Sequence, residues 1–259
     1  MIRGLYGAAG AMMTEMVKLD TIANNLANVN TTGFKGDMAV FEEQMRQSLA
    51  RTSDRPDGTN LLPSGEPVYI GQLGGAGQLE GIHTDYAEGM YKETQNPLDF
   101  ALVGEGFFAV DTGAGIRYTR NGSFTMSDSG ELVTHDGFKV LGANGPIQVP
   151  EGAAVTAGDD GRLSVDGVEI DQLQVVSFDK PFPLVKVGNS LFQAPTDAPV
   201  IPSMAKVKQG GIEGSNVSSV TEMIHMIATM RAYEAASKAL QGEDELLGKA
   251  VNEVGRLQG

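Results

Sequence analysis

A long helix at the start of this chain ends within the stretch ANNLANVNTTGFK, residues 23–35. Its polar members are Asn24, Asn25, Asn28, Asn30, Thr31 and Thr32. Gly33 follows them and precedes Phe34, a natural place for the left-handed residue that closes a helix. We therefore expect the helix to end near residues 28–30, and any substitution of Gly33 to be costly if its φ is positive. The asparagine amides are available either to the local helix end or to a neighbouring subunit.

Upstream of this stretch, apolar residues recur at alternating spacings of four and three. They are Leu5, Ala9, Met12, Met16, Leu19, Ala23 and Leu26. Such heptad periodicity is typical of a coiled coil, so it predicts a helix over residues 4–29 whose apolar face meets another helix.

The other end of the chain carries a second heptad pattern. Its apolar members are Met223, Met226, Met230, Tyr233, Leu240, Leu247 and Val251, with the polar Ser237 and Asp244 between them. Ser219-Val220-Thr221-Glu222 has the form of a capping box and marks the start of a helix, which we expect over residues 217–255. The methionines of both faces either fill a flexible core or form a coiled-coil face shared between the chain ends or between subunits.

The middle of the chain has a different composition. Residues 36–95 are rich in proline and glycine and predict an extended, irregular connector, with a short helical continuation over residues 38–49. Glycine turns then follow one another closely between short apolar segments, which predicts hairpins in an all-β domain. The turns are Asn121-Gly122, Ser129-Gly130, Asp136-Gly137, Asn144-Gly145, Asp160-Gly161 and Asp166-Gly167.

The predicted fold is therefore α+β, with long terminal helices paired as a coiled coil and a central all-β domain. We expect the N-terminal helix of a discontinuous coiled-coil domain in residues 1–35 and the connector in residues 36–95. The β domain then spans residues 96–192, a return connector residues 193–214, and the C-terminal helix residues 215–259.

Charge and composition exclude several functions. The chain has 33 acidic and 19 basic residues and a net charge of -14, without a basic cluster, so we expect no binding to nucleic acid. It has no cysteine, and no segment long and apolar enough for a membrane span. We also expect no cleavable signal peptide.

Catalytic, cofactor and metal sites are not predicted. The loose dinucleotide pattern in residues 104–109 leads into a predicted strand, whereas that fingerprint requires a helix. His83, His135 and His225 are far apart and lack metal-ligand spacing. We therefore expect no enzyme, no cofactor and no metal.

The stretch at residues 23–35 closely resembles the N-terminal signature of the flagellar rod and hook protein family. Further resemblances lie in Asn96-Pro97-Leu98-Asp99, in residues 104–110, in residues 118–124, and in the helix segment of residues 226–235, where the family usually has Gln at the position of Met230. The resemblance covers both ends and the middle of the chain, and it departs mainly in residues 36–92 and 150–210.

This resemblance implies a self-assembling structural subunit of the flagellar axis, located in the basal body and exported through the flagellar secretion channel. Its partners would be copies of itself, neighbouring rod and hook subunits, and the export apparatus. The opening Met1-Ile2-Arg3-Gly4-Leu5-Tyr6 is most similar to the distal rod protein. A proximal rod or hook subunit of the same family is the alternative, and a secreted cell-surface binding module is the alternative from another class.

Overall fold

The computed structural model describes residues 2–43, 47–51, 68–73, 77–150, 153–180, 182 and 184–256. The chain divides into two units. The helical unit comprises Met1–Asn24, Asp37–Thr84 and Val220–Gly259, and the β unit comprises Asn25–Gly36 and Asp85–Ser219. Each unit is therefore assembled from segments that are distant in the sequence. The boundaries between these units, after residues 24, 36, 84 and 219, differ from the expected domain boundaries.

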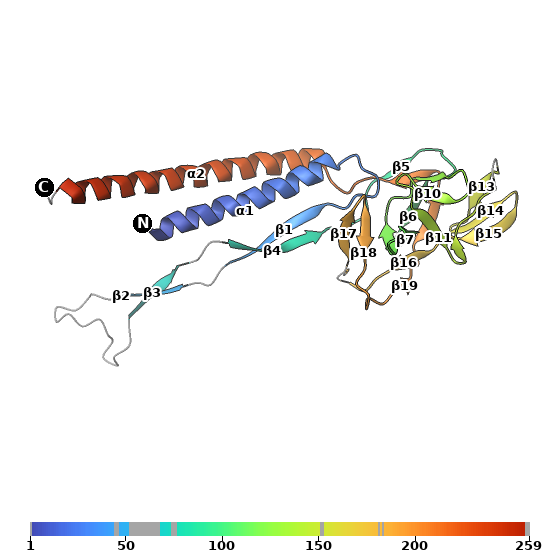
Figure 1. Ribbon diagram of the computed structural model, residues 1–259, viewed down its shortest axis with the longest axis horizontal. Helices are drawn as coiled ribbons and strands as arrows, with labels where there is room; N and C mark the ends of the chain where they lie inside the picture. Colours follow the sequence, from blue (N-terminus) through green and yellow to red (C-terminus); the bar gives the residue numbers. More distant parts are fainter. Residues whose placement is uncertain are drawn as a thin grey trace. The chain divides into compact units, whose positions relative to one another are not determined.

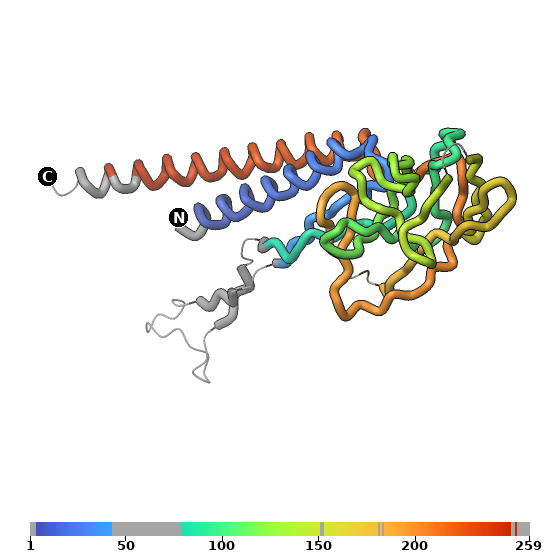
Figure 2. Tube along the Cα trace, turned by 45° about the vertical axis from the view of Figure 1, so that its right-hand side comes forward, coloured from blue at the N-terminus to red at the C-terminus, as the bar shows by residue number. Residues whose placement is uncertain are grey.

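Two long helices dominate the helical unit. Helix α1 spans Ile2–Ala27 and helix α2 spans Ser219–Arg256, which confirms both predicted helices to within a few residues. The helices lie side by side and run in opposite directions (Figures 1 and 2). The carboxylate of Glu243 on α2 lies so close to Gly4 on α1 that a Cβ on Gly4 would be 2.8 Å from its Oε1 atom.

Besides the helices, the described residues of the helical unit form two strand pairs. Strand β1 (Asp37–Glu43) pairs antiparallel with β4 (Gly77–Thr84), and β2 (Gln47–Arg51) pairs antiparallel with β3 (Val68–Leu73). The expected helical continuation over residues 38–49 is therefore wrong. Tertiary context overrides local helix preference here, because β1 finds a partner strand about forty residues later along the chain.

The β unit is built around one antiparallel sheet with the strand order β17-β18-β8-β7-β11-β10-β9. In that order the strands span Val185–Gly188, Leu191–Gln193, Ile116–Thr119, Phe107–Asp111, Lys139–Gly142, Leu132–Thr134 and Phe124–Met126. Strand β12 (Gly145–Pro146) adds to β11, and β16 (Val175–Ser177) joins β7 to β19 (Ile201–Pro202).

Smaller sheets complete the β unit. Strands β13 (Val155–Ala157), β14 (Arg162–Val165) and β15 (Val168–Gln172) form a three-stranded sheet. Strand β6 (Phe100–Val103) pairs with β20 (Lys206–Gln209), and β5 (Tyr91–Glu93) pairs with β21 (Gly211–Glu213), which directly precedes α2 in the chain.

The hydrophobic core of the β unit lies on both faces of strand β7. Phe108 and Val110 belong to one cluster of buried residues, whereas Phe107 and Ala109 belong to a second. Successive side chains of a strand point to opposite faces, so a strand buried on both faces is apolar at every position. This explains the continuous apolar run in residues 107–110.

Glycine turns connect the strands largely as predicted. In five of the six predicted turns the glycine has a positive φ, but Gly122 does not. The prediction of a hairpin at Asn121-Gly122 is wrong, because the flanking strands β8 and β9 pair with other strands. Gly122 is needed for a close approach instead, since a Cβ there would lie 1.8 Å from the carbonyl oxygen of Phe100.

Candidate functional site

The heptad face of α1 is divided between partly buried and exposed positions. Leu5, Met12, Leu19 and Leu26 are half-buried and form one column along the helix. The predicted heptad face also included Ala9, Met16 and Ala23, which lie on one side of this column. Of these, Ala9 is half-buried, Ala23 is exposed, and Met16 is 57% exposed. The flank that turns inward carries Ala8, Glu15 and the buried Ile22 instead.

Helix α2 shows the same arrangement. Met226, Tyr233, Leu240 and Leu247 are half-buried and form its central column. The inward flank carries Thr229, Ala236 and Glu243, whereas the predicted Met223 and Met230 are 46% and 49% exposed. The side chain of Val251 lies outside the described residues.

Each helix therefore has a central column with two flanks, and one flank carries a buried residue, Ile22 in α1 or Thr229 in α2. We call the other one the outer flank, and it is made of Ala9, Met16, Ala23, Met223, Met230, Ser237 and Asp244. A heptad pattern does not distinguish between the two flanks, because both repeat every seven residues.

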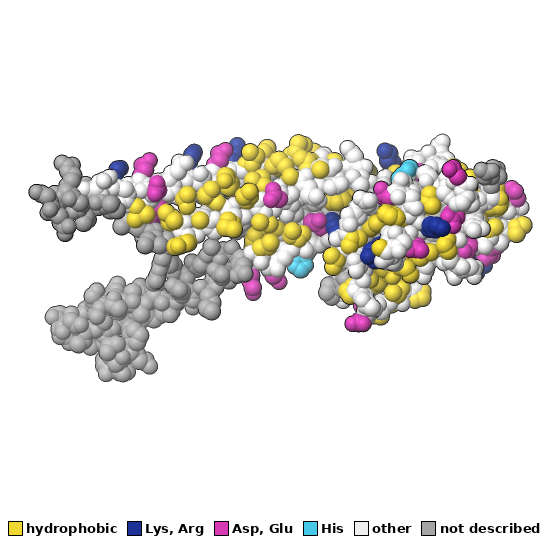
Figure 3. Space-filling view, viewed as in Figure 1, with side chains coloured by type: hydrophobic (Ala, Val, Ile, Leu, Met, Phe, Trp, Pro, Cys, Tyr) yellow, Lys and Arg dark blue, Asp and Glu magenta, His cyan; other side chains and the backbone are white. Residues whose placement is uncertain are grey.

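The first half of α2 exposes an apolar stripe that includes part of the outer flank. The stripe consists of Val220, Met223, Ile224, Ile227 and Met230, all between 46% and 62% exposed. These spacings place the residues on one side of a helix. Figure 3 shows hydrophobic side chains gathered along the helices. Clustered apolar residues on a surface are typical of a contact with another protein.

The asparagine-rich stretch begins in the last turn of α1 and continues into the loop that follows the helix. Asn28 Oδ1 accepts a hydrogen bond from Thr31 Oγ1 at 3.2 Å, and Asn25 is buried. Thr32 Oγ1 donates to Asn121 Oδ1 at 2.8 Å. Asn24 and Asn30 have exposed side chains. The stretch thus combines residues that close the helix locally with residues that face solvent.

Gly33 has a φ of 65°, so the expected left-handed conformation is confirmed, but α1 ends at Ala27 and Gly33 therefore does not close the helix directly. A Cβ at this position would lie 2.3 Å from the backbone nitrogen of Asn121. Two separate constraints therefore require glycine here, namely the backbone conformation and the space.

A buried charge cluster follows Gly33 and was not predicted. Lys35, Arg120 and Glu213 are 1%, 3% and 3% exposed. Lys35 Nζ lies 2.5 Å from Glu213 Oε1, and Arg120 Nη1 lies 3.1 Å from Glu213 Oε2. One carboxylate therefore binds two cations. The three residues come from segments far apart in the sequence, so no spacing rule could have found them.

Backbone groups complete the cluster. Lys35 Nζ also donates to the carbonyl oxygen of Ala87 at 2.6 Å, and Arg120 Nη2 donates to that of Gly104 at 2.7 Å. The backbone nitrogen of Gly89 donates to Glu213 Oε1 at 2.8 Å. Burial lowers the pKa of the Lys35 ammonium, an effect that the Glu213 carboxylate opposes.

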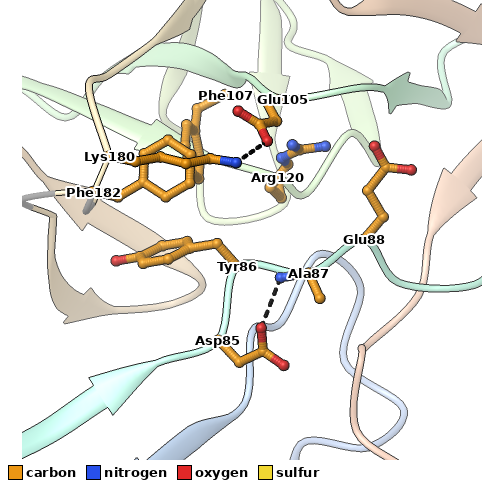
Figure 4. A pocket seen from close by; sticks show the side chains of 9 residues that line it. All are labelled: Asp85, Tyr86, Ala87, Glu88, Glu105, Phe107, Arg120, Lys180 and Phe182. Atoms are coloured by element: carbon orange, nitrogen blue, oxygen red, sulfur yellow. Dashed lines mark hydrogen bonds and ion pairs between the residues drawn. The ribbon is translucent and has the colours of Figure 1, made fainter.

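A cavity of about 310 Å³ lies beside this cluster and shares Arg120 with it (Figure 4). Tyr86 and Phe182 pack edge to face in its wall, with ring centroids 4.9 Å apart. At the rim Lys180 forms an ion pair with Glu105. Among the described residues the lining includes neither serine nor histidine, so it does not provide a serine nucleophile with a histidine base.

One serine and one histidine do meet elsewhere in the β unit. Ser123 Oγ lies 3.3 Å from His135 Nε2 and donates to Asp99 Oδ1 at 3.2 Å. In a catalytic triad the carboxylate orients the histidine, whereas here it binds the serine hydroxyl. Asp99 also accepts from Thr94 Oγ1 at 2.7 Å, so this group ties loops together.

Among the described residues, no group of three or more His, Cys, Asp or Glu side chains could hold a metal ion. Neither helix of the described chain is apolar enough over eighteen residues to span a membrane.

Three family models match separate segments of the chain. "Flagella basal body rod protein" matches residues 5–35, "Flagellar hook protein FlgE/F/G D1 domain" matches residues 101–165, and "Flagellar basal body rod FlgEFG protein C-terminal" matches residues 208–253. Lys35, Arg120 and Glu213 each lie in a different one of these segments.

Curated relatives extend over nearly the whole chain. The flagellar basal-body rod protein FlgG of Borreliella burgdorferi is 35% identical, covering 97% of this chain and 98% of the relative. FlgG of Bacillus subtilis is 34% identical, covering 97% and 99%. The flagellar basal-body rod protein FlgF of Mesorhizobium japonicum is 35% identical, covering 97% of both chains. Sequence identity therefore does not decide whether this chain is more similar to FlgG or to FlgF.

Proposed function

This chain belongs to the flagellar basal-body rod protein family, and we propose that it builds the axial rod by packing the outer flanks of its helices against other subunits. It is a structural subunit of the basal body and not an enzyme. In the proposed assembly α1 and α2 pair as a coiled coil within each subunit. Copies of the chain then form a helical tube that transmits torque.

The observation that carries this proposal is the exposure of the methionines on the outer flank. Met16 on α1 and Met223 and Met230 on α2 lie about half in solvent and continue the heptad pattern of the half-buried central columns. Burying apolar surface contributes roughly 25 cal/mol per Å², and a helical polymer repeats the gain at every contact. A second copy of the same chain supplies matching heptads.

The proposed subtype is the distal rod, on the likeness of residues 1–6 to that protein. Neighbouring rod and hook subunits would be the further partners, and the flagellar export apparatus would deliver the chain without a cleaved signal peptide. Expression in cells that lack either FlgG or FlgF tests the subtype. Recovery of swimming only in cells without FlgG supports the distal rod, and recovery only in cells without FlgF contradicts it.

Assembly itself is tested with one substitution on the outer flank. Met230→Glu should abolish polymerisation of the purified full-length subunit, measured by light scattering and electron microscopy, because it buries a charge in each contact. Met204→Glu is the matched control, since Met204 lies in the β unit and is 100% exposed. Normal filaments from Met230→Glu would show that the outer flank is not the contact.

A further inference from the structure

The chain passes between its two units four times, after residues 24, 36, 84 and 219. Within the β unit, the residues next to these crossings are tied together around Asn216. The backbone nitrogen of Gly36 donates to Asn216 Oδ1 at 2.7 Å, and Asn216 Nδ2 donates to the carbonyl oxygen of Asp85 at 2.9 Å. The backbone nitrogen of Asp85 donates to the carbonyl oxygen of Gly36 at 2.8 Å.

A second, buried layer of contacts joins the same three segments. Lys35 Nζ donates to the carbonyl oxygen of Ala87 at 2.6 Å and to Glu213 Oε1 at 2.5 Å. The backbone nitrogen of Gly33 donates to the carbonyl oxygen of Glu213 at 2.8 Å. The segment that follows α1, the segment that follows β4 and the segment that precedes α2 thus meet at Lys35 and Glu213.

Stability alone does not account for this cluster. Two cations share one buried carboxylate, and a buried ion pair is often no more stable than apolar side chains of similar volume. Buried hydrogen bonds with defined directions do restrict geometry, however, because each donor must meet its acceptor. The cluster therefore restricts where the three segments lie within the β unit.

We infer that Lys35, Glu213 and Asn216 form a clamp that holds the end of the α1 segment beside the start of the α2 segment, so that the two helices meet in one register. This inference rests on the proposed pairing of α1 and α2. Lys35 and Glu213 are 178 residues apart. Bringing two helices together costs more entropy when a longer flexible loop connects them. Because the clamp joins Lys35 to Glu213, only the short segments between the clamp and each helix remain as the connection.

The clamp is tested by measuring the distance between the far parts of the two helices in the full-length subunit. The chain has no cysteine, so Tyr6→Cys on α1 and Gln241→Cys on α2, both at exposed positions, give two unique spin-label sites. Pulsed electron spin resonance then records the distance distribution. Lys35→Met removes the clamp's ammonium, and Lys92→Met, at an exposed lysine on β5, is the matched control.

We expect a narrow distribution in the otherwise unsubstituted chain and in Lys92→Met, and loss of the narrow peak in Lys35→Met. The melting temperature of the β unit should not fall in Lys35→Met, because Glu213 keeps its pair with Arg120. If Lys35 only stabilised the β unit, Lys35→Met would lower that melting temperature and leave the distribution of helix distances narrow.

Asn216→Ala provides a second variant that leaves the buried charges intact, and it should also lose the narrow peak. It decides the question if Lys35→Met fails to fold. A narrow peak retained in the folded variants overturns the clamp while leaving the helix pairing standing. A broad distribution in the unsubstituted chain overturns the helix pairing and the clamp together.

Discussion

The Lys35 ammonium lies 2.5 Å from the Glu213 carboxylate, and both side chains are almost completely buried in the β unit. Glu213 also binds Arg120, so among the described residues one carboxylate serves as the ion-pair partner of two buried cations. Removal of the carboxylate and removal of one cation should therefore have very different consequences.

Glu213→Gln should destabilise the β unit by about 3–5 kcal/mol, because it leaves two buried cations without a counter-ion. Lys35→Met should leave the free energy of unfolding of the β unit nearly unchanged, since the Glu213–Arg120 pair remains. Urea unfolding followed by near-ultraviolet circular dichroism measures both. Equal losses in the two variants would contradict this account of the cluster.

Lys35 should also make stability depend on pH. Because burial lowers its pKa in the folded state, the unfolded chain binds more protons between the folded and the ordinary pKa. Stability due to this residue therefore rises with pH in that window. The unfolding free energy of the wild type should increase relative to that of Lys35→Met as pH approaches 10, and a constant difference between the two would refute the shift.

Gly33→Ala should destabilise the β unit more than Gly137→Ala does. Both glycines have a positive φ, but only Gly33 has backbone atoms where a Cβ would be placed. Gly137→Ala should cost about 1–2 kcal/mol for the left-handed conformation alone. Gly33→Ala adds a clash with Asn121. Urea unfolding of both variants therefore distinguishes the free-energy cost of the clash from that of the left-handed backbone.

Leu19→Asp should abolish rod formation and motility while the β unit stays folded and the chain is still exported. Leu19 is half-buried in the central column of α1, and an unpaired charge there is costly. Electron microscopy of basal bodies and hydrogen exchange of the β unit measure the two effects. Unfolding of the β unit would show that this column belongs to a different architecture.

The control for Leu19→Asp must be chosen from the structure. Lys18 looks solvent-facing in the sequence, but its ammonium lies 2.8 Å from Glu15 and 5.2 Å from the centre of the Phe41 ring. Asp20 is exposed, so Asp20→Ala should leave assembly and motility unchanged.

Local periodicity determined the helices and most of the turns. A heptad repeat predicts a helix because its apolar residues lie on one side of any helix with that spacing. The positive φ of Gly33 was also predicted locally, because glycine adopts the left-handed conformation readily, although α1 ends six residues earlier at Ala27. These features depend on residues a few positions apart, so the sequence alone contains them.

Only the tertiary structure decided which flank of each heptad turns inward and which partner each distant segment finds. Ile22 and Thr229 are buried while Met16 and Met230 are not, although both pairs fit a seven-residue repeat. Strand β1 pairs with β4, and Lys35 pairs with Glu213, across loops whose length no local pattern encodes. The physical reason is that periodicity specifies a face of one element, whereas the choice among compatible partners depends on the packing of the whole unit.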